Sequence, residues 1–404
     1  MKKTTTRMTT RVTGALIAAG AMIAAADACA QSSVTLYGAV DDAVAYANNQ
    51  KGSSNVYMRQ GNLAASKWGL NGVEDLGGGL AAIFDLQAGF DLNTGASSTS
   101  GLLFNRQAYV GLRSNAYGQV TMGRQYTPYL LFVGPLASSW ALTGATGAHP
   151  GDIDGLDTTI RINNSITYNT PIFAGLQGSA MYALGGQPGS TGKGQTFSGA
   201  LKYAYGPMSF AAAYLQMDNA ATNVTSTNPT PNFDSSSTGS FGISALNQGY
   251  ASARSVRHAA LAGTYTFGNA MVGLNYTNVR YLPGAHSIPA FTDTAVFNTY
   301  AAIGTYRFTP AFDVAAGYSY TMASKANGID DAARYQQIAL KQAYHLSKRT
   351  TLYAIQAYQH ANGSTLNAAG AIVDAAPSVG DSQNGTPSST RNQFVGMLGM
   401  TVLF

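Results

Sequence analysis

Apolar and polar side chains alternate along most of this chain, in segments of about ten residues. When residues 80–91 are extended, Leu80, Phe84 and Leu86 fall on one side and Asp85 and Gln87 on the other. Successive side chains of a β-strand point to opposite faces, so each segment gives a strand with one apolar and one polar face. About ten residues is also the length that a tilted strand needs to cross the hydrocarbon of a bilayer.

The alternating segments are numerous, and their connections alternate in length. We count sixteen segments, which begin near Val34, Ser66, Leu80, Phe104, Val120, Ile160, Gly175, Thr196, Met208, Arg257, Ala270, Thr294, Phe312, Arg334, Thr351 and Asn392. Short connections rich in Gly, Pro, Asn and Asp alternate with long ones such as residues 218–254 and 361–391. The pattern predicts an all-β fold, a 16-stranded antiparallel transmembrane β-barrel with short periplasmic turns and long external loops.

A soluble β-sandwich is the main alternative fold, since its strands also alternate. One face of a sandwich meets water, so a chain of 404 residues should then expose many charges. Asp, Glu, Lys and Arg make up only 10% of this chain, against about 25% of a soluble domain. The low charge favours lipid around the strands, and closure into a barrel pairs every strand edge, as hydrocarbon demands.

The first 30 residues have the order of a secretory signal peptide. Four basic residues precede an apolar run at residues 14–26, and Ala28-Cys29-Ala30 ends it in the small-residue pattern of a cleavage site. Cleavage after Ala30 divides the chain into a signal, residues 1–30, and a barrel domain, residues 31–404, which holds no cysteine. A lipoprotein signal acylated at Cys29 is the alternative, disfavoured by the nearby Asp27.

The charge of the chain is partly a property of this signal. Its cleavage removes four of the 23 basic residues and one of the 18 acidic residues, leaving a net charge of about +2. Nucleic-acid binding needs a clustered basic face that can neutralise phosphates, and the barrel domain has no run of Lys and Arg. We therefore expect no nucleic-acid partner.

Several segments resemble the Gram-negative general porins of the β-proteobacterial outer-membrane type. They are, in order, VTLYGAVDDAVAY, SKWGLNGVEDLGGGLAAIFDLQAGF, FNRQAYVGL, QVTMGRQYTP, RINNSITYNTP and the aromatic terminus GMTVLF. The resemblance runs over nearly all of residues 31–404. It implies a homotrimer in the cell outer membrane, with the third external loop, residues 126–159, folded inward as a constriction loop.

Alternation points two cations into the lumen of such a barrel. Lys67 alternates with Trp68, and Arg161 alternates with Ile162 and with Ile166 further along. Rings of charged side chains discriminate ions in a passive pore, so we expect these cations to form a basic wall.

Two further arginines are ambiguous. The resemblance implies that Arg106, in FNRQAYVGL, belongs to the same basic wall, whereas simple alternation groups it with the apolar Ala108 and Val110 on an outward face. Arg124 shares its face with Met122, which leaves three sites open: a subunit interface, the root of the third loop, or the lumen.

Three aspartates lie on the descending arm of the third loop, in HPGDIDGLD. If this loop folds inward, Asp152, Asp154 and Asp157 would face the basic wall and create a transverse field across the narrowest section. The alternative is that they cap turns and solvate a loop, because Asp-Gly is also ordinary turn chemistry.

Other chemistry is sparse. The five histidines show no metal-ligand spacing, and the pattern G-x-x-x-x-G-K-[ST] of a phosphate loop is absent, so we expect neither a metal nor a cofactor. The leading hypothesis is a passive, weakly charge-selective, water-filled channel for ions and small hydrophilic solutes. An outer-membrane barrel enzyme, such as a phospholipase or protease, and an adhesive or structural barrel remain as alternatives.

The last residue is a candidate assembly signal. Alternation places Phe404 on the apolar face with Val402 and Met400. The resemblance implies that a terminal aromatic residue is read by the barrel-assembly machinery. Outer-membrane lipid and lipopolysaccharide complete the expected partners.

Overall fold

The computed structural model describes residues 33–137, 144–190, 192–219, 243–381 and 385–404. The predicted signal peptide, residues 1–30, lies outside these described residues. The strands are β1 (Ser33–Gln50), β2 (Ser53–Gln60), β3 (Lys67–Gly77), β4 (Leu80–Gly89), β5 (Gln107–Ser114), β6 (Gly118–Tyr126), β7 (Arg161–Asn169), β8 (Leu176–Ala183), β9 (Thr196–Tyr205), β10 (Met208–Asp218), β11 (Ser255–Phe267), β12 (Ala270–Leu282), β13 (Ala295–Thr309), β14 (Phe312–Ala323), β15 (Arg334–His345), β16 (Thr350–Asn362), β17 (Ser364–Leu366), β18 (Ile372–Asp374) and β19 (Asn392–Leu403). Helical segments are α2 (Pro128–Val133) and the 3-10 turns η1 (Gly134–Leu136), η3 (Gly144–Gly147), η4 (Pro150–Asp152) and η6 (Gln248–Tyr250).

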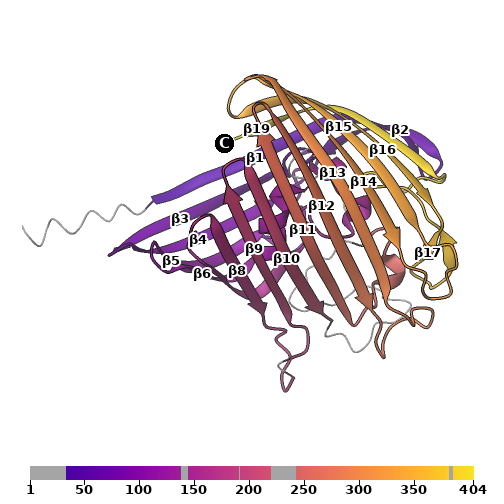
Figure 1. The fold of residues 1–404 in the computed structure, drawn as a ribbon, viewed down its shortest axis with the longest axis horizontal. Helices are drawn as coiled ribbons and strands as arrows, with labels where there is room; N and C mark the ends of the chain where they lie inside the picture. Colours follow the sequence, from indigo (N-terminus) through magenta and orange to yellow (C-terminus); the bar gives the residue numbers. More distant parts are fainter. Residues whose placement is uncertain (1–32, 138–143, 191, 220–242, 382–384) are drawn as a thin grey trace, which may run out of the picture.

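Seventeen of these strands form one antiparallel sheet that closes on itself (Figure 1). β1 pairs with β19 on one side, with Ala39 opposite Leu403. On its other side β1 pairs with β3 along one half and with β2 along the other half, so β2 and β3 share one position around the barrel. The predicted 16-stranded antiparallel barrel is therefore confirmed.

β2 itself is a difference from the sequence prediction, which placed the first loop ahead of a strand beginning near Ser66. The segment SSNVYMRQ pairs with the second half of β1, and the strand position is interrupted at residues 61–66 before it continues as β3. Its alternation is too weak to reveal a strand, because exposed Ser53, Ser54 and Asn55 occupy both faces of its first half.

The two faces of the wall divide as alternation predicts. On β12, Leu274 points outward with 69% of its surface exposed, whereas Asn275 and Thr277 point inward with 5% and 0% exposed. Such an apolar exterior is stable only in contact with hydrocarbon, because burial of apolar surface is what drives folding in water.

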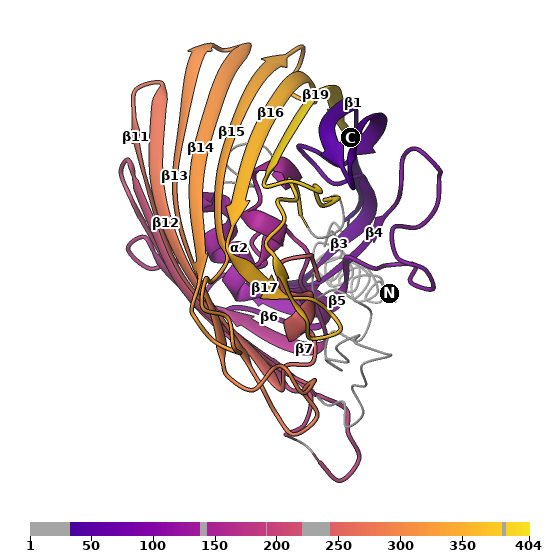
Figure 2. The same cartoon turned by 90° about the vertical axis from the view of Figure 1, so that its right-hand side faces the viewer.

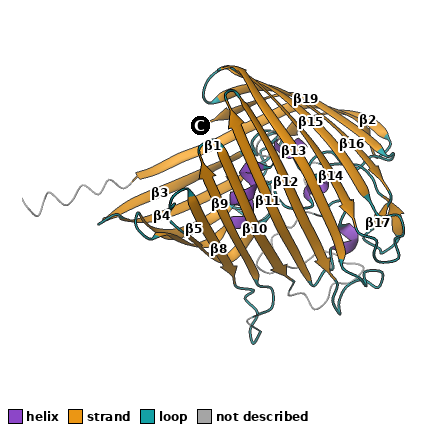
Figure 3. Ribbon diagram, viewed as in Figure 1, coloured by secondary structure: helices purple, strands orange, loops and turns teal. Residues whose placement is uncertain are grey.

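Turns and loops separate to opposite ends of the barrel. β11 and β12 are joined by only Gly268 and Asn269, with Gly268 at φ +56°, which a glycine adopts without steric cost. The long connections gather at the other end, along the lower edge of Figure 3. In the described part of the chain, no helix has both the length and the apolarity to cross a bilayer.

The connection between β6 and β7, residues 127–160, turns into the barrel; we call it loop L3. Figure 2 shows α2 inside the ring of strands. Thr127 caps this helix by accepting the N–H of Leu130 at 3.2 Å, and Pro128 occupies the first turn, where its missing N–H costs nothing. The N–H of Tyr129 donates to Ser198 Oγ on β9 at 3.1 Å, which fixes the helix to the wall.

Apolar side chains seal L3 against one side of the lumen. They form a single buried cluster with the inner faces of β8 to β13, which includes Tyr129, Phe132, Ile153, Leu215 and Phe297. Each of these side chains is at most 7% exposed. The polar space of the lumen is therefore displaced toward the opposite wall, where β1 to β7 supply the side chains.

Candidate functional site

The polar side of the lumen contains a cavity of about 280 Å³. Its lining includes the cations Lys67, Arg106 and Arg161 and the carboxylates of Asp157 and Asp381. The three predicted wall cations are therefore brought together, and one of the three predicted loop aspartates faces them.

Lys67 is positioned by the interruption between β2 and β3. The buried carboxylate of Asp41, on β1, accepts backbone N–H groups from Asn62 at 2.7 Å, Leu63 at 3.1 Å and Ala64 at 3.3 Å. A carboxylate that collects several N–H groups holds a segment of backbone in place. This segment then delivers Lys67 to the cavity as the first residue of β3.

Arg106 reaches the lumen because the chain is irregular just before β5. Gln107 pairs with Gln87 in the register of β4 and β5, and the N–H of Arg106 also donates to Gln87 O at 3.1 Å. Two residues opposite one are a β-bulge, which breaks the alternation that would place Arg106 outside. Its Nε donates to Gln87 Oε1 at 3.0 Å, and the side chain is 5% exposed.

Tyr126 joins the two arginines. The guanidinium carbon of Arg161 lies 5.4 Å from the centroid of its ring, and that of Arg106 lies 5.9 Å away. Both distances are within the range of cation–π attraction. The ring lies opposite Arg161 across the β6–β7 pair, so it holds two like charges near each other.

Arg124 is at the root of L3. Its Nε donates to Asn105 O at 2.8 Å, and its Nη1 donates to Asn163 Oδ1 at 2.5 Å. The side chain is 9% exposed and ties the start of β5 to the start of β7. Of the three sites left open by the sequence, the geometry favours the loop root.

Alternation also fails at the start of β7. Ile166 and Tyr168 point outward as predicted, but Ile162 is fully buried in the apolar cluster under L3. Asn164 has φ +53°, and the pairing of β6 with β7 shifts its register there. The shift allows Arg161 to face the cavity while Ile162 is also inside.

Asp154 anchors L3 to the wall and is not among the described residues that line the cavity. One carboxylate oxygen lies 2.5 Å from His149 Nδ1 and accepts Thr277 Oγ1 of β12 at 2.8 Å. Its carbonyl oxygen lies 2.8 Å from Nδ1 of His258, on β11. Burial would raise the pKa of Asp154, but the charge and hydrogen bond of His149 outweigh it and lower the pKa.

Asp152 closes a turn inside L3. Its carboxylate accepts Thr159 Oγ1 and, at 3.0 Å, the N–H of Asp157. Burial and the neighbouring negative charge of Asp154 raise the pKa of Asp152 well above its usual value. These two hydrogen bonds join Asp152 to Asp157 and Thr159 and so close a turn in the last part of L3. Asp157 lines the cavity from this turn.

Asp157 faces positive charge. It lines the cavity with Arg106, and the charges of Arg106 and Arg59 act on it. Burial, together with the charges of Asp381 and Asp152, nevertheless raises the pKa of Asp157 well above its usual value.

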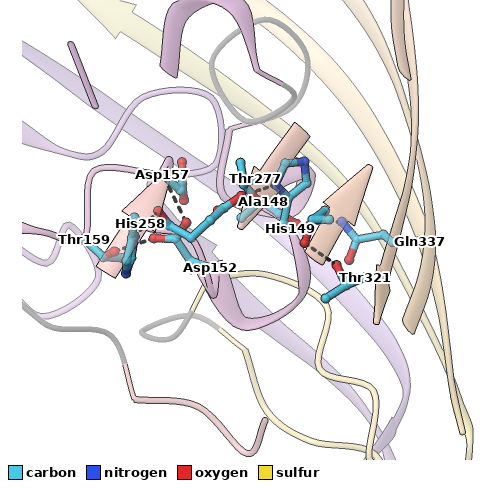
Figure 4. A network of polar contacts seen from close by, with 11 residues as sticks. Ala148, His149, Asp152, Asp157, Thr159, His258, Thr277, Thr321 and Gln337 are labelled. Carbon is cyan, nitrogen blue, oxygen red and sulfur yellow. Dashed lines mark hydrogen bonds and ion pairs between the residues drawn. The ribbon is translucent and has the colours of Figure 1, made fainter. Parts of the chain in front are cut away.

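The far end of L3 is held by two further contacts. Gln337, on β15, donates Nε2 to the carbonyl oxygens of Thr146 at 3.2 Å and Ala148 at 2.8 Å (Figure 4). The N–H of Ala145 donates to Asn62 O at 3.1 Å, next to the interruption before β3. L3 is thus fastened to β9, β11, β12 and β15 and reaches the wall that carries Lys67.

Sequence reasoning missed two charged residues of this site. Arg59, on β2, is 3% exposed and lies so close to Gly380 that a Cβ there would contact its guanidinium. Asp381 enters from the loop between β16 and β19, which also folds inward: the N–H of Ser378 donates to Gln359 Oε1 at 2.6 Å. Neither residue has a local pattern that could have revealed it, because Arg59 lies on a strand with weak alternation and Asp381 arrives through the folding of a loop.

The described residues hold no group of three or more His, Cys, Asp or Glu side chains placed to bind a metal ion. A closed barrel with an apolar exterior, an infolded loop and a charged lumen defines a channel-forming outer-membrane protein.

Comparisons with known proteins identify the family. The model of the Gram-negative porin family matches residues 15–364, and the chain belongs to this family. It is 29% identical to an outer membrane porin protein of Bordetella pertussis over 361 residues, which cover 81% of this chain and 89% of that protein. It is 35% identical to outer membrane porin protein 32 of Delftia acidovorans over 219 residues, 51% of this chain and 60% of that protein.

The fold agrees with solved porins. The anion-selective porin from Comamonas acidovorans is similar with a TM-score of 0.68 and 24% identity, over 93% of this chain and all of that one. The family resemblance drawn from the sequence is confirmed, and so is the predicted function. The protein is an outer-membrane porin, a passive diffusion channel for ions and small hydrophilic solutes.

Proposed function

We propose that the constriction of this channel lies between the basic wall of Lys67, Arg106 and Arg161 and the loop carboxylates of Asp157 and Asp381. The observation that carries the proposal is that all five side chains line one cavity of about 280 Å³. Opposite charges across a narrow section create a transverse field that acts on every permeating ion.

We propose that the channel prefers anions. Three cations line the cavity against two carboxylates, and the charge of the buried Arg59 also acts on Asp157. The Comamonas acidovorans porin of similar fold is described as anion-selective, which supports this sign. Charges in a wide aqueous lumen are screened within about 8 Å at physiological salt, so the preference should be modest and should shrink as salt rises.

Reversal potentials across a planar bilayer with a salt gradient test this proposal. Lys67→Gln with Arg161→Gln should move the reversal potential toward cation selectivity, and Asp157→Asn with Asp381→Asn should move it toward stronger anion selectivity. Lys348→Gln, at an exposed turn, removes a cation away from this cavity and serves as the control. If neither double variant shifts the potential at low salt, the constriction is built from other residues.

Asp152 and Asp154 have a different role in this proposal. Their carboxylates are occupied by contacts within L3 and to β12, so we propose that they hold the loop rather than face the solute. Neutralising either one should change the stability of the loop more than the sign of selectivity.

We propose that the chain works without catalysis. One row of side chains near the short turns, Asp313, His345 and Thr351, has the hydrogen-bond order of a carboxylate–histidine–hydroxyl relay, at 2.6 and 2.9 Å. Lys341 Nζ, however, lies 3.2 Å from the other oxygen of Asp313, which is the arrangement of a structural ion-pair cluster. Release of product from ester or peptide substrates that is lost in Thr351→Val would overturn the proposal.

We propose a homotrimer in contact with lipopolysaccharide, assembled by the barrel-assembly machinery through Phe404. The family resemblance supports the trimer. Phe404 is 45% exposed and lies on the outward face with Met400. This exposure supports recognition of Phe404 by a protein outside the barrel. Cross-linking of the folded protein in outer-membrane vesicles should give a trimer.

A further inference from the structure

Two arginines lie directly opposite each other on the lipid-facing side of the barrel. Arg257 of β11 and Arg280 of β12 are cross-strand partners, each the third residue from the long-loop end of its strand. Both alternate with inward residues: Val256 and His258 on one strand, Val279 and Tyr281 on the other, are fully buried or nearly so. Both arginine side chains therefore point outward.

Such a pair is unfavourable by itself. Directly opposite side chains have Cβ atoms about 5 Å apart, and like charges at that spacing destabilise a sheet. Among the described residues, no carboxylate lies within ion-pair distance of either guanidinium. Arg280 Nε donates to the neutral Asn278 Oδ1 at 2.8 Å. Arg257 Nε is shielded from solvent and has no hydrogen-bond partner in the described part of the chain.

Two other charged side chains at this end of the barrel have hydrogen-bond partners. Arg334, also outward and near the long-loop end, donates Nη2 to Asp331 at 2.5 Å and Nε to Asn362 at 3.0 Å. Asp218, beside Arg257 across β10 and β11, accepts Gln216 at 3.0 Å and Gln195 at 3.4 Å. The arginine pair is thus a site of uncompensated positive charge between satisfied neighbours.

The position of Arg257 and Arg280 relative to the membrane indicates which group balances their positive charge. Four residues toward the membrane centre from Arg280, about 13 Å along the strand, Tyr276 donates its hydroxyl to Asn298 at 2.8 Å. Tyr214 and Tyr300 are outward and exposed in the same band, which is where an aromatic belt marks the membrane–water interface. The arginines lie on the headgroup side of this belt.

A cavity of about 360 Å³ adjoins the pair at the ends of β10, β11 and β12. Gln216, directly opposite Arg257, is part of its lining. Lys193, Arg254 and His286 also line it, together with the carboxylate of Asp218, which accepts hydrogen bonds from Gln195 and Gln216. The surface therefore combines the arginine pair, Lys193 and Arg254 with room for a polar headgroup.

We propose that Arg257 and Arg280 bind a phosphate group of the lipopolysaccharide in the outer leaflet, with the adjoining cavity receiving its sugar headgroup. Guanidinium groups match phosphate in geometry and charge, and a phosphate between the two arginines removes their mutual repulsion. This site rests on the contact with lipopolysaccharide proposed above and specifies where on the barrel the lipid binds. It does not depend on the proposed ion selectivity.

The test measures binding of lipopolysaccharide to the purified full-length channel by native mass spectrometry in EDTA. EDTA removes divalent cations that bridge phosphates, so the remaining binding reports direct contacts with the protein. Arg257→Gln with Arg280→Gln should weaken the affinity at least about tenfold, since each lost charge-assisted contact is worth roughly that factor. Arg257→Lys with Arg280→Lys should retain an intermediate affinity.

Arg334→Gln is the matched control, because it removes an outward arginine whose charge is already paired; it should bind as the wild type does. The wild type titrated with enzymatically dephosphorylated lipopolysaccharide should show the same tenfold loss, which keeps the test valid if a variant folds poorly. Unchanged affinity of the folded double variant, or equal affinity for the dephosphorylated lipid, would overturn the site. Conductance and reversal potential recorded from the same protein report separately on the channel function.

Discussion

The aromatic ring of Phe404 covers Gly38 so closely that a Cβ built on Gly38 would overlap the ring. Their backbones are also joined, since Gly38 N–H donates to Phe404 O at 2.9 Å and Phe404 N–H donates to Gly38 O at 3.1 Å. Gly38 lies on the first strand and Phe404 follows the last one, so this pair completes the closure of the barrel.

Gly38→Ala should destabilise that closure. The added methyl group would meet both the ring of Phe404 and the backbone oxygen of Lys67, and overpacking of this kind costs about 1–3 kcal/mol. Urea titration in detergent should show the loss. Gly304→Ala is the control, because a Cβ there meets only one atom at ordinary van der Waals distance; equal stability of the two variants would contradict the prediction.

Deleting Phe404 should reduce assembly rather than permeation. The residue lies outside the lumen, so channels that do assemble should keep the wild-type conductance, while the yield of folded, heat-modifiable trimer falls. Gel mobility without heating measures the yield, and single-channel recording measures the survivors. A normal trimer yield would show that Phe404 is a simple interfacial anchor.

Selectivity should depend on pH through Asp157. Its pKa is raised by burial and by the charges of Asp381 and Asp152, so it takes up a proton at a higher pH than an ordinary aspartate, whose pKa is about 3.9. As pH falls through this raised pKa, the cavity should lose negative charge and the reversal potential should move toward anions, at a higher pH than an ordinary aspartate would allow. Asp157→Asn should flatten this response.

The same shift has a consequence for stability. A carboxyl group whose pKa is higher in the folded state binds its proton more tightly there, so stability falls as pH rises from the unfolded to the folded pKa. Above its folded-state pKa the ionised Asp157 therefore opposes folding, and Asp157→Asn should raise the unfolding midpoint more at high pH than at pH 3, which lies below the ordinary pKa of an aspartate. Equal effects at both pH values would contradict the shifted pKa.

The outer face offers a test of membrane exposure. Leu274, on the lipid-facing side of β12, is 69% exposed, and an arginine on that side of a barrel costs up to about 2–4 kcal/mol. Leu274→Arg should lower the free energy of unfolding in phospholipid vesicles by that amount. Leu346→Arg, at a short turn, should cost less than about 1 kcal/mol, because cost falls toward the interface.

Alternation was sufficient to predict the barrel because a strand between lipid and water repeats one simple constraint along its whole length. Alternation correctly assigned the inward and outward faces of regular strands such as β12. It also placed Lys67, at the start of β3, on the lumen wall. It failed where the backbone departs from regular pairing. The bulge before β5 brings Arg106 inside, and the register shift beside Asn164 buries Ile162.

The acidic side of the site was harder to predict, since it depends on loops. The spacing of Asp152, Asp154 and Asp157 could not distinguish a carboxylate that faces the cavity from one that binds His149 or Thr159. Asp381 is more than two hundred residues away along the chain and reaches the same cavity through a separate loop. Such convergence is set by tertiary contacts and leaves no local pattern.

Asp154 should control how firmly L3 is held. Asp154→Ala removes the acceptor of both His149 and Thr277 and leaves these buried groups unpaired, which costs about 1–3 kcal/mol. Because the same carboxylate joins L3 to β12, its loss should make L3 accessible to protease and increase the current noise of single channels. Asp330→Ala, at an exposed position of another loop, should change neither property. Quiet channels and a protease-resistant L3 in Asp154→Ala would show that the apolar cluster beneath the loop is enough to hold it.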